Sequence, residues 1–196
     1  MIEDKINEAK FFLIKMNEEV KKEKPRLFVI SCYYSAFLSA SYSVYDYALL
    51  NANRVFKLGL SDEEFWDWKK FQTEAEKQKN SGALKYFDWW YSRRNNENNM
   101  TIGKAFSACR RINIHKRPTY KIGVDVKADV GKTETRKDGS IATSIKINPK
   151  LFLQVEGFEQ MRIEDACGTY LSTIEKFSGD HHKIIDKIER EELKIE

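Results

Sequence analysis

The sequence predicts a mainly α-helical protein: an antiparallel helical bundle with one β-hairpin inserted at about residues 119–148, in a single domain covering residues 1–196. Two patterns support this fold class. Apolar residues recur every three or four positions through most of the chain, which is typical of amphipathic helices. After Pro118 the period changes to two, which is typical of a strand with one buried face. With 196 residues, 41% of them hydrophobic, the chain can bury a sizeable core.

Two helices are expected in the first 50 residues. The second should run from Arg26 to about Leu50, after a charged run and Pro25 have ended the first. It contains serines at every fourth position, whose small side chains would let another helix approach closely. We expect tight packing inside the bundle there, and a dimer seam is the alternative. The stripe of the first helix is Ile2, Ile6, Ala9, Leu13, Met16 and Val20, and the serine row is Ser31, Ser35, Ser39 and Ser43.

Three further helices are expected before Pro118. The sequence SDEE at 61–64 has the form of a capping box and predicts the start of the third helix. The run RRNNENN at 93–99 predicts a polar loop after the fourth, and Thr101 would cap the fifth. The inward-facing residues should be Phe65, Trp68 and Phe71 or Ala75 in the third helix, Leu84, Phe87 and Trp90 or Tyr91 in the fourth, and Ile102, Ala105, Phe106 and Cys109 in the fifth.

The clearest strand signal lies between Tyr120 and Val130, where apolar residues alternate with charged residues and a glycine. Asp138-Gly139 predicts a type I′ turn, and residues 141–147 should return antiparallel. A broad apolar helical face then follows, and a charged helical tail is expected from about Lys183. The apolar residues of that face are Ile163, Ala166, Cys167, Tyr170, Leu171, Ile174 and Phe177.

Composition limits the classes of function. The net charge of +4 is too small by itself to indicate a nucleic-acid partner. Residues 27–45 carry no charge, but their five serines and four tyrosines make them poorly apolar for lipid, so we expect a buried helix, no membrane partner and a cytoplasmic location. The cysteines, which are far apart, should be buried residues of a reducing compartment: Cys32, Cys109 and Cys167.

Several other patterns favour structural roles. Gly131, Lys132 and Thr133 resemble the end of a phosphate-binding loop, but the earlier glycine of that motif is missing. His181 and His182 are adjacent and would point to different faces of a helix, so we expect exposed polar residues, no metal site and no cofactor. The tryptophans occur at helical spacing and should lie in the core rather than stack on bases: Trp66, Trp68, Trp89 and Trp90.

The candidate site is the stretch ACRRINIHKRP at residues 108–118. It lies inside a segment, residues 98–124, that contains no acidic residue, so its local field should be positive enough to attract a phosphodiester. Arginine can donate two hydrogen bonds to phosphate oxygens, and histidine can exchange a proton with a ribose 2′-hydroxyl near neutral pH. On composition alone, a solvated basic helix end remains the alternative. The basic residues of the segment are Lys104, Arg110, Arg111, Lys116, Arg117 and Lys121.

Arg110 and His115, with four residues between them, match the Arg-x4–6-His signature of the HEPN superfamily, which the chain resembles. The sequences EAKFFLIKM and YYSAFLSASYSVYDYAL are similar to the first two helices of one bacterial HEPN-like group. The predicted hairpin and EDACGTYLSTIEKF are similar to its later half. Arg111 replaces the Asn, Asp or His that often follows the motif arginine. It also lies four residues before His115, so it is a rival to Arg110.

The resemblance implies a homodimer in which two Arg/His pairs form one composite cleft. It implies metal-independent cleavage of single-stranded RNA that leaves a cyclic phosphate, in a defence, toxin–antitoxin or stress setting with an antitoxin or other protein partner. His115 would be the general acid or base, Arg110 or Arg111 would hold the phosphate, and Asn113 would orient these groups. A non-catalytic HEPN-like module that binds RNA or a protein is the alternative. The residues expected to bind flanking RNA are Lys104, Lys116 and Arg117.

Overall fold

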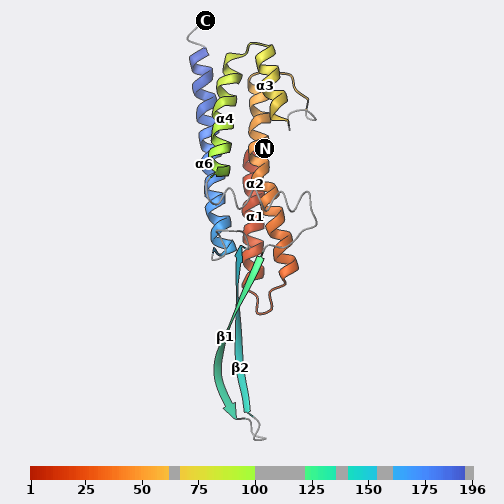
Figure 1. Ribbon diagram of the computed structural model, residues 1–196, viewed down its shortest axis with the longest axis vertical. Helices are drawn as coiled ribbons and strands as arrows, with labels where there is room; N and C mark the ends of the chain where they lie inside the picture. Colours follow the sequence, from red (N-terminus) through yellow and green to blue (C-terminus); the bar gives the residue numbers. More distant parts are fainter. Residues whose placement is uncertain (62–66, 100–121, 136–140, 154–160, 193–196) are drawn as a thin grey trace.

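The computed structural model describes residues 1–61, 67–99, 122–135, 141–153 and 161–192. This part of the chain is mainly helical, and its helices lie side by side along the long axis of the molecule (Figure 1). A pair of long strands extends beyond one end of the helices. The elements are α1 (Ile2–Val20), α2 (Leu27–Val55), α3 (Trp68–Lys77), α4 (Ser81–Asn99), β1 (Ile122–Thr135), β2 (Ile141–Leu153) and α6 (Ile163–Glu192).

The first helix has the predicted bounds, its predicted stripe is buried except for the half-buried Val20, and it packs against α2 and α6. A buried carboxylate closes the turn that follows. Glu19 accepts hydrogen bonds from the backbone N–H and the Nε of Arg26, both at 3.1 Å, and a further one from Lys22. The bonds from Arg26 and then Lys22 lower the pKa of Glu19 to about 2. The turn between α1 and α2 is therefore fixed by one ionised side chain.

The second helix is longer than predicted, because Ala52 and Asn53 are buried and continue it to Val55. The Asn53 amide then holds the loop after the helix by bonding both the N–H and the carbonyl of Leu60. The predicted tight packing of the serine row holds only in part: Ser31 is buried, Ser35 and Ser43 are half-buried, and Ser39 is exposed, with its carbonyl accepting a bond from the Ser43 hydroxyl. Larger residues form much of the buried face of α2, including Tyr34, Phe37, Leu38 and Tyr45.

Among the described residues, α2 is the one helix that is long and apolar enough to cross a membrane. Half of its most apolar window is buried inside the protein. The cysteine prediction is correct for Cys167, which is buried, and wrong for Cys32, which is exposed on α2. Cys109 lies outside the described residues.

The third helix begins at Trp68 rather than after the predicted capping box. Asp67 is the N-cap, with an extended backbone and a carboxylate that accepts the N–H of Lys69 at 3.0 Å. Residues 62–66, including Phe65 and Trp66, lie outside the described residues. Before α4, the Asn80 side chain accepts the N–H of Ala83 and donates to the carbonyl of Phe56, which joins this helix start to the end of α2.

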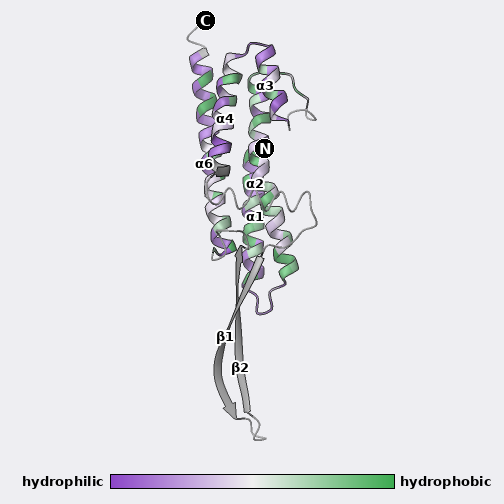
Figure 2. Ribbon diagram, in the orientation of Figure 1, coloured by the Kyte–Doolittle hydropathy of each residue, from purple (hydrophilic) through white to green (hydrophobic). Residues whose placement is uncertain are grey.

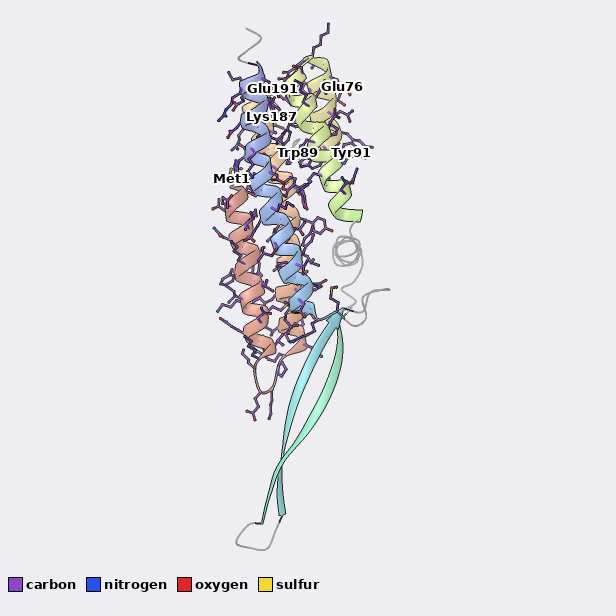
Figure 3. The ribbon with its side chains drawn as sticks, turned by 90° about the vertical axis from the view of Figure 1, so that its left-hand side faces the viewer. Met1, Glu76, Trp89, Tyr91, Lys187 and Glu191 are labelled. Atoms are coloured by element: carbon purple, nitrogen blue, oxygen red, sulfur yellow. The ribbon has the colours of Figure 1, made fainter. Side chains whose placement is uncertain are left out.

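Aromatic residues of α2, α4 and α6 form much of the core. Phe177 of α6 lies 4.6 Å from Tyr45 and 5.4 Å from Trp89 between ring centroids. Trp90 is fully buried and donates its indole N–H to the carbonyl of Tyr45 at 3.1 Å, whereas Tyr91 is 41% exposed. Figure 3 labels Trp89 and Tyr91 on α4. The prediction that the tryptophans belong to the core is confirmed for Trp90, while Trp68 and Trp89 are half-buried and pack against the core.

The strands β1 and β2 pair antiparallel, with an irregularity between Val130 and Thr133. Up to that point the register pairs apolar residues with apolar residues at every second position. Successive residues of a strand lie on opposite faces, so these pairs share one face of the ribbon. We call the set the apolar ribbon face: Ile122 with Leu153, Val124 with Leu151, Val126 with Pro149, Ala128 with Ile147, and Val130 with Ile145.

Candidate functional site

The predicted site lies in the segment that joins α4 to β1. Since α4 ends at Asn99 and β1 begins at Ile122, this segment covers residues 100–121. All the residues predicted for catalysis or RNA binding fall within residues 100–121, outside the described residues: Lys104, Arg110, Arg111, Asn113, His115, Lys116 and Arg117.

The last turns of α4, which lead into that segment, are held by two arginines. Arg93 donates to the carboxylate of Asp180 on α6 at 2.9 Å, and both side chains are about one-third exposed. The Arg94 guanidinium lies over the ring of Trp90, 5.0 Å from its centroid. The predicted polar loop at residues 93–99 is therefore wrong, because these side chains have partners that favour continuing the helix.

The prediction for His181 is wrong. It was expected to be exposed at the start of a charged tail, but it lies within α6 and is completely buried. Its Nδ1 is 2.8 Å from the Tyr86 hydroxyl of α4, and its Nε2 is 3.0 Å from the side-chain nitrogen of Asn51 on α2. The imidazole therefore ties three helices together.

These contacts determine the tautomer of His181. The Tyr86 hydroxyl has one proton, which it donates to the carbonyl of Ala48 at 3.3 Å, so its oxygen is left to accept from His181 Nδ1–H. The Nε2 lone pair then accepts the amide N–H of Asn51. One proton thus satisfies both ring nitrogens, and a second proton would have no acceptor.

Burial and the neighbouring His182 both oppose a positive charge, and together they lower the pKa of His181 to about 4. Burial likewise raises the pKa of the Tyr86 hydroxyl well above its usual value. His181 is therefore neutral at pH 7 and enclosed by protein. The imidazole contributes to the packing of the core, and its burial keeps it from contacting a substrate.

His182 lies beside a small surface cavity of about 150 Å³. Its Nε2 is 4.0 Å from the carboxylate of Glu3, which also accepts the Ser178 hydroxyl at 3.1 Å. Pockets for small molecules are usually larger, about 300–1,000 Å³. This cavity therefore suits water or a small ion better than a substrate. Its lining residues are Met1, Ile2, Glu3, Tyr47, Asn51, Arg54 and His182.

Within the described ranges, no three His, Cys, Asp or Glu residues are grouped so that they could hold a metal ion. Comparisons with protein-family models, curated proteins and solved structures found no match to the chain.

Proposed function

We propose that the protein is a HEPN-like, metal-independent endoribonuclease that cleaves single-stranded RNA. In this proposal the helices form the antiparallel HEPN-like bundle, and the β1–β2 pair is the hairpin inserted after the catalytic motif. The observation that carries the proposal is the sequence RRINIH at residues 110–115 inside a segment without acidic residues.

The described histidines support His115 as the reactive one. His181 has both ring nitrogens engaged and a pKa of about 4, so it would be a poor proton acceptor for a substrate. His182 faces the Glu3 carboxylate, which would repel a phosphate group. Of the three histidines in the chain, His115 is the one that shares a sequence segment with six basic residues.

The proposed reaction uses two copies of the chain. His115 of one copy accepts the proton of the ribose 2′-hydroxyl as that oxygen bonds to phosphorus. The bond from phosphorus to the 5′ oxygen breaks, and His115 of the partner subunit, in its protonated form, gives a proton to the leaving oxygen. Arg110 or Arg111 donates to the charged phosphate oxygens, and Asn113 orients the reacting groups. The products are a 2′,3′-cyclic phosphate and a 5′-hydroxyl.

The test is incubation with labelled single-stranded RNA in the presence of a chelator. The wild-type protein should cleave, His115→Ala should lose at least about 100-fold in rate, and His182→Ala should cleave normally as the matched control. Arg110→Ala and Arg111→Ala compared side by side should identify the phosphate-binding arginine. Full activity in His115→Ala would refute the mechanism. Binding that weakens steeply with salt, without scission, would instead indicate the non-catalytic RNA-binding module.

A further inference from the structure

Three aromatic rings are stacked where the start of α3 packs against α4. Phe87 is buried, and its ring is stacked with that of Trp68 at 6.0 Å and with that of Tyr91 at 5.8 Å between centroids. The Trp68 and Tyr91 rings are themselves 5.2 Å apart. Trp68 is half-buried and Tyr91 is 41% exposed, so the stack reaches the protein surface. We call these three residues the aromatic platform.

Two basic side chains accompany the aromatic platform. The ammonium of Lys69, which is exposed, lies 5.7 Å from the centroid of the Trp68 ring. Arg94 follows Tyr91 by three residues and so shares its side of α4, and its Nε is buried without a hydrogen-bond partner. Within the described ranges, neither Lys69 nor Arg94 has a carboxylate partner. Their positive charges are therefore not neutralised by the described part of the chain.

Another exposed aromatic residue shows that this combination is not general. Phe11 of α1 is 52% exposed and also has a lysine over its ring, with the Lys15 ammonium 5.8 Å from the centroid. That ammonium donates to the Glu18 carboxylate at 2.8 Å, so its charge is paired on the helix surface. The aromatic platform differs because the cations beside its rings have no such pairing.

We propose that the aromatic platform binds one nucleotide of a single-stranded RNA, with the base stacked on Trp68 and Tyr91 and the phosphates near Lys69 and Arg94. Exposed rings beside positive charges are the combination that binds single-stranded nucleic acids. A cationic ligand is disfavoured, because positive charges already lie beside the rings. A wholly apolar ligand would bury part of these charges without compensation. The choice of RNA as the ligand rests on the proposed function.

Two carboxylates near the aromatic platform in sequence constrain where a phosphate can lie. Asp67 accepts the backbone N–H of Lys69 as the N-cap of α3. Asp88 is exposed on α4 three residues before Tyr91, whereas Arg94 lies three residues after it. A phosphate next to the stacked base therefore lies on the Arg94 side, where it is attracted and is farthest from Asp88.

This side of α4 leads toward the proposed catalytic residues in sequence. Tyr91 lies about 12 Å along the helix from Asn99, at a rise of about 1.5 Å per residue. The last turns of α4 are strongly hydrophilic, as Figure 2 shows. A strand bound along these turns runs toward the point where the segment of residues 100–121 begins. The nucleotide on the aromatic platform thus flanks the bond that is cleaved.

The test is binding of a short labelled oligouridylate by the full chain carrying His115→Ala, which keeps the RNA intact. Adding Tyr91→Leu or Arg94→Gln should each raise the dissociation constant about 10-fold, through loss of a stacked base and of a phosphate contact. The matched controls are Phe11→Leu, which removes another exposed ring, and Arg93→Gln, which removes a paired charge. Each control should change the dissociation constant less than about 2-fold.

Two further measurements separate stacking from a structural effect. Tyr91→Phe keeps the ring and should bind like the parent protein, and circular dichroism should show unchanged helix content in every variant. With an abasic strand of the same length, Tyr91→Leu should no longer weaken binding, whereas Arg94→Gln should still do so, because the phosphates remain.

The outcomes distinguish this inference from the ribonuclease proposal. Binding that is unchanged by both Tyr91→Leu and Arg94→Gln, or weakened equally by the controls, would overturn the platform as a nucleotide site, even if the wild-type protein cleaves RNA. Binding that depends on Tyr91 and Arg94, without cleavage by the wild-type protein, would support the site and count against the ribonuclease mechanism. Absence of RNA binding by the wild-type protein would overturn the inference.

Discussion

The helical body and the β-ribbon both have clear apolar patterns, and the described side chains show how the helical pattern is buried. The stripes of α1, α2, α4 and α6 meet in one core, and even the polar side chain of His181 is paired there. The ribbon has an apolar register of similar regularity, and it extends beyond one end of the helices (Figure 1). Alternation in sequence therefore predicts which element forms, while the covering surface depends on where the chain places that element.

The largest expected difference between the two regions comes from truncating one apolar residue in each. Trp90→Ala removes a fully buried ring and its bond to Tyr45, and it should lower the free energy of unfolding by about 3–5 kcal/mol. Ile147→Ala in the ribbon should leave helix unfolding unchanged at low protein concentration. Urea denaturation followed by helical circular dichroism measures both. Similar losses in the two variants would mean that ribbon and helices unfold as one unit.

The next effect concerns His181 and depends on pH. Its folded pKa of about 4 lies below the ordinary 6.5, so between these values the unfolded chain binds more protons. Stability should therefore fall as the pH is lowered through this window, by about 2 kcal/mol from this residue at pH 5. Denaturation midpoints at pH 7.5 and pH 5 would reveal the loss.

The controls for this pH effect are His181→Gln and His182→Ala. His181→Gln should remove most of the pH dependence between pH 4.5 and 6.5, although it costs stability at pH 7.5. His182→Ala should keep the dependence, because His182 is exposed. If the slope survives in His181→Gln, the buried imidazole is not its source.

A third prediction uses Glu19, whose pKa of about 2 lies below its ordinary 4.5. A carboxylate with a lowered pKa stabilises the fold above the unfolded pKa, and this contribution is lost as the pH falls from about 4.5 toward 2. Glu19→Gln should lower the melting temperature at pH 7 and flatten this acid-induced loss. The neighbouring Glu18→Gln should do neither, since Glu18 is exposed and pairs with Lys15 on the surface.

The smallest effect should come from the ion pair between Arg93 and Asp180. The pair is partly exposed, so Arg93→Ala should cost about 0.5–1 kcal/mol. A double-mutant cycle with Asp180→Ala isolates the pairwise contribution. A coupling near zero would show that α4 continues past Arg93 without this contact.

Much of the helical part could be predicted from periodicity. The first helix has the bounds that its stripe indicated, and Phe71, Ala75, Trp90 and Phe177 are buried as expected. Helix ends were less predictable, because long-range contacts determine them. The pairing of Arg93 with Asp180 joins residues 87 positions apart, and no local pattern reveals it.

The burial of His181 could have been predicted in part from its spacing along α6. It lies four residues after Phe177 and four before Ile185, on the buried stripe of α6. The charged residues around His181 made an exposed position the natural prediction. A polar residue on an apolar stripe is buried only where hydrogen-bond partners are available to it. Those partners, Tyr86 and Asn51, come from other helices. The catalytic assignment remains a sequence prediction, since residues 100–121 lie outside the described part.

The projecting ribbon also affects how the protein moves through solvent. A compact chain of 196 residues has a radius of gyration of about 16 Å. The 14-residue strand β1 alone is roughly 45 Å long. Friction rises with such elongation, so even a single chain should migrate on a sizing column ahead of globular standards of equal mass. Elution volume would thus overstate the number of subunits, whereas small-angle scattering would report the extended dimension directly.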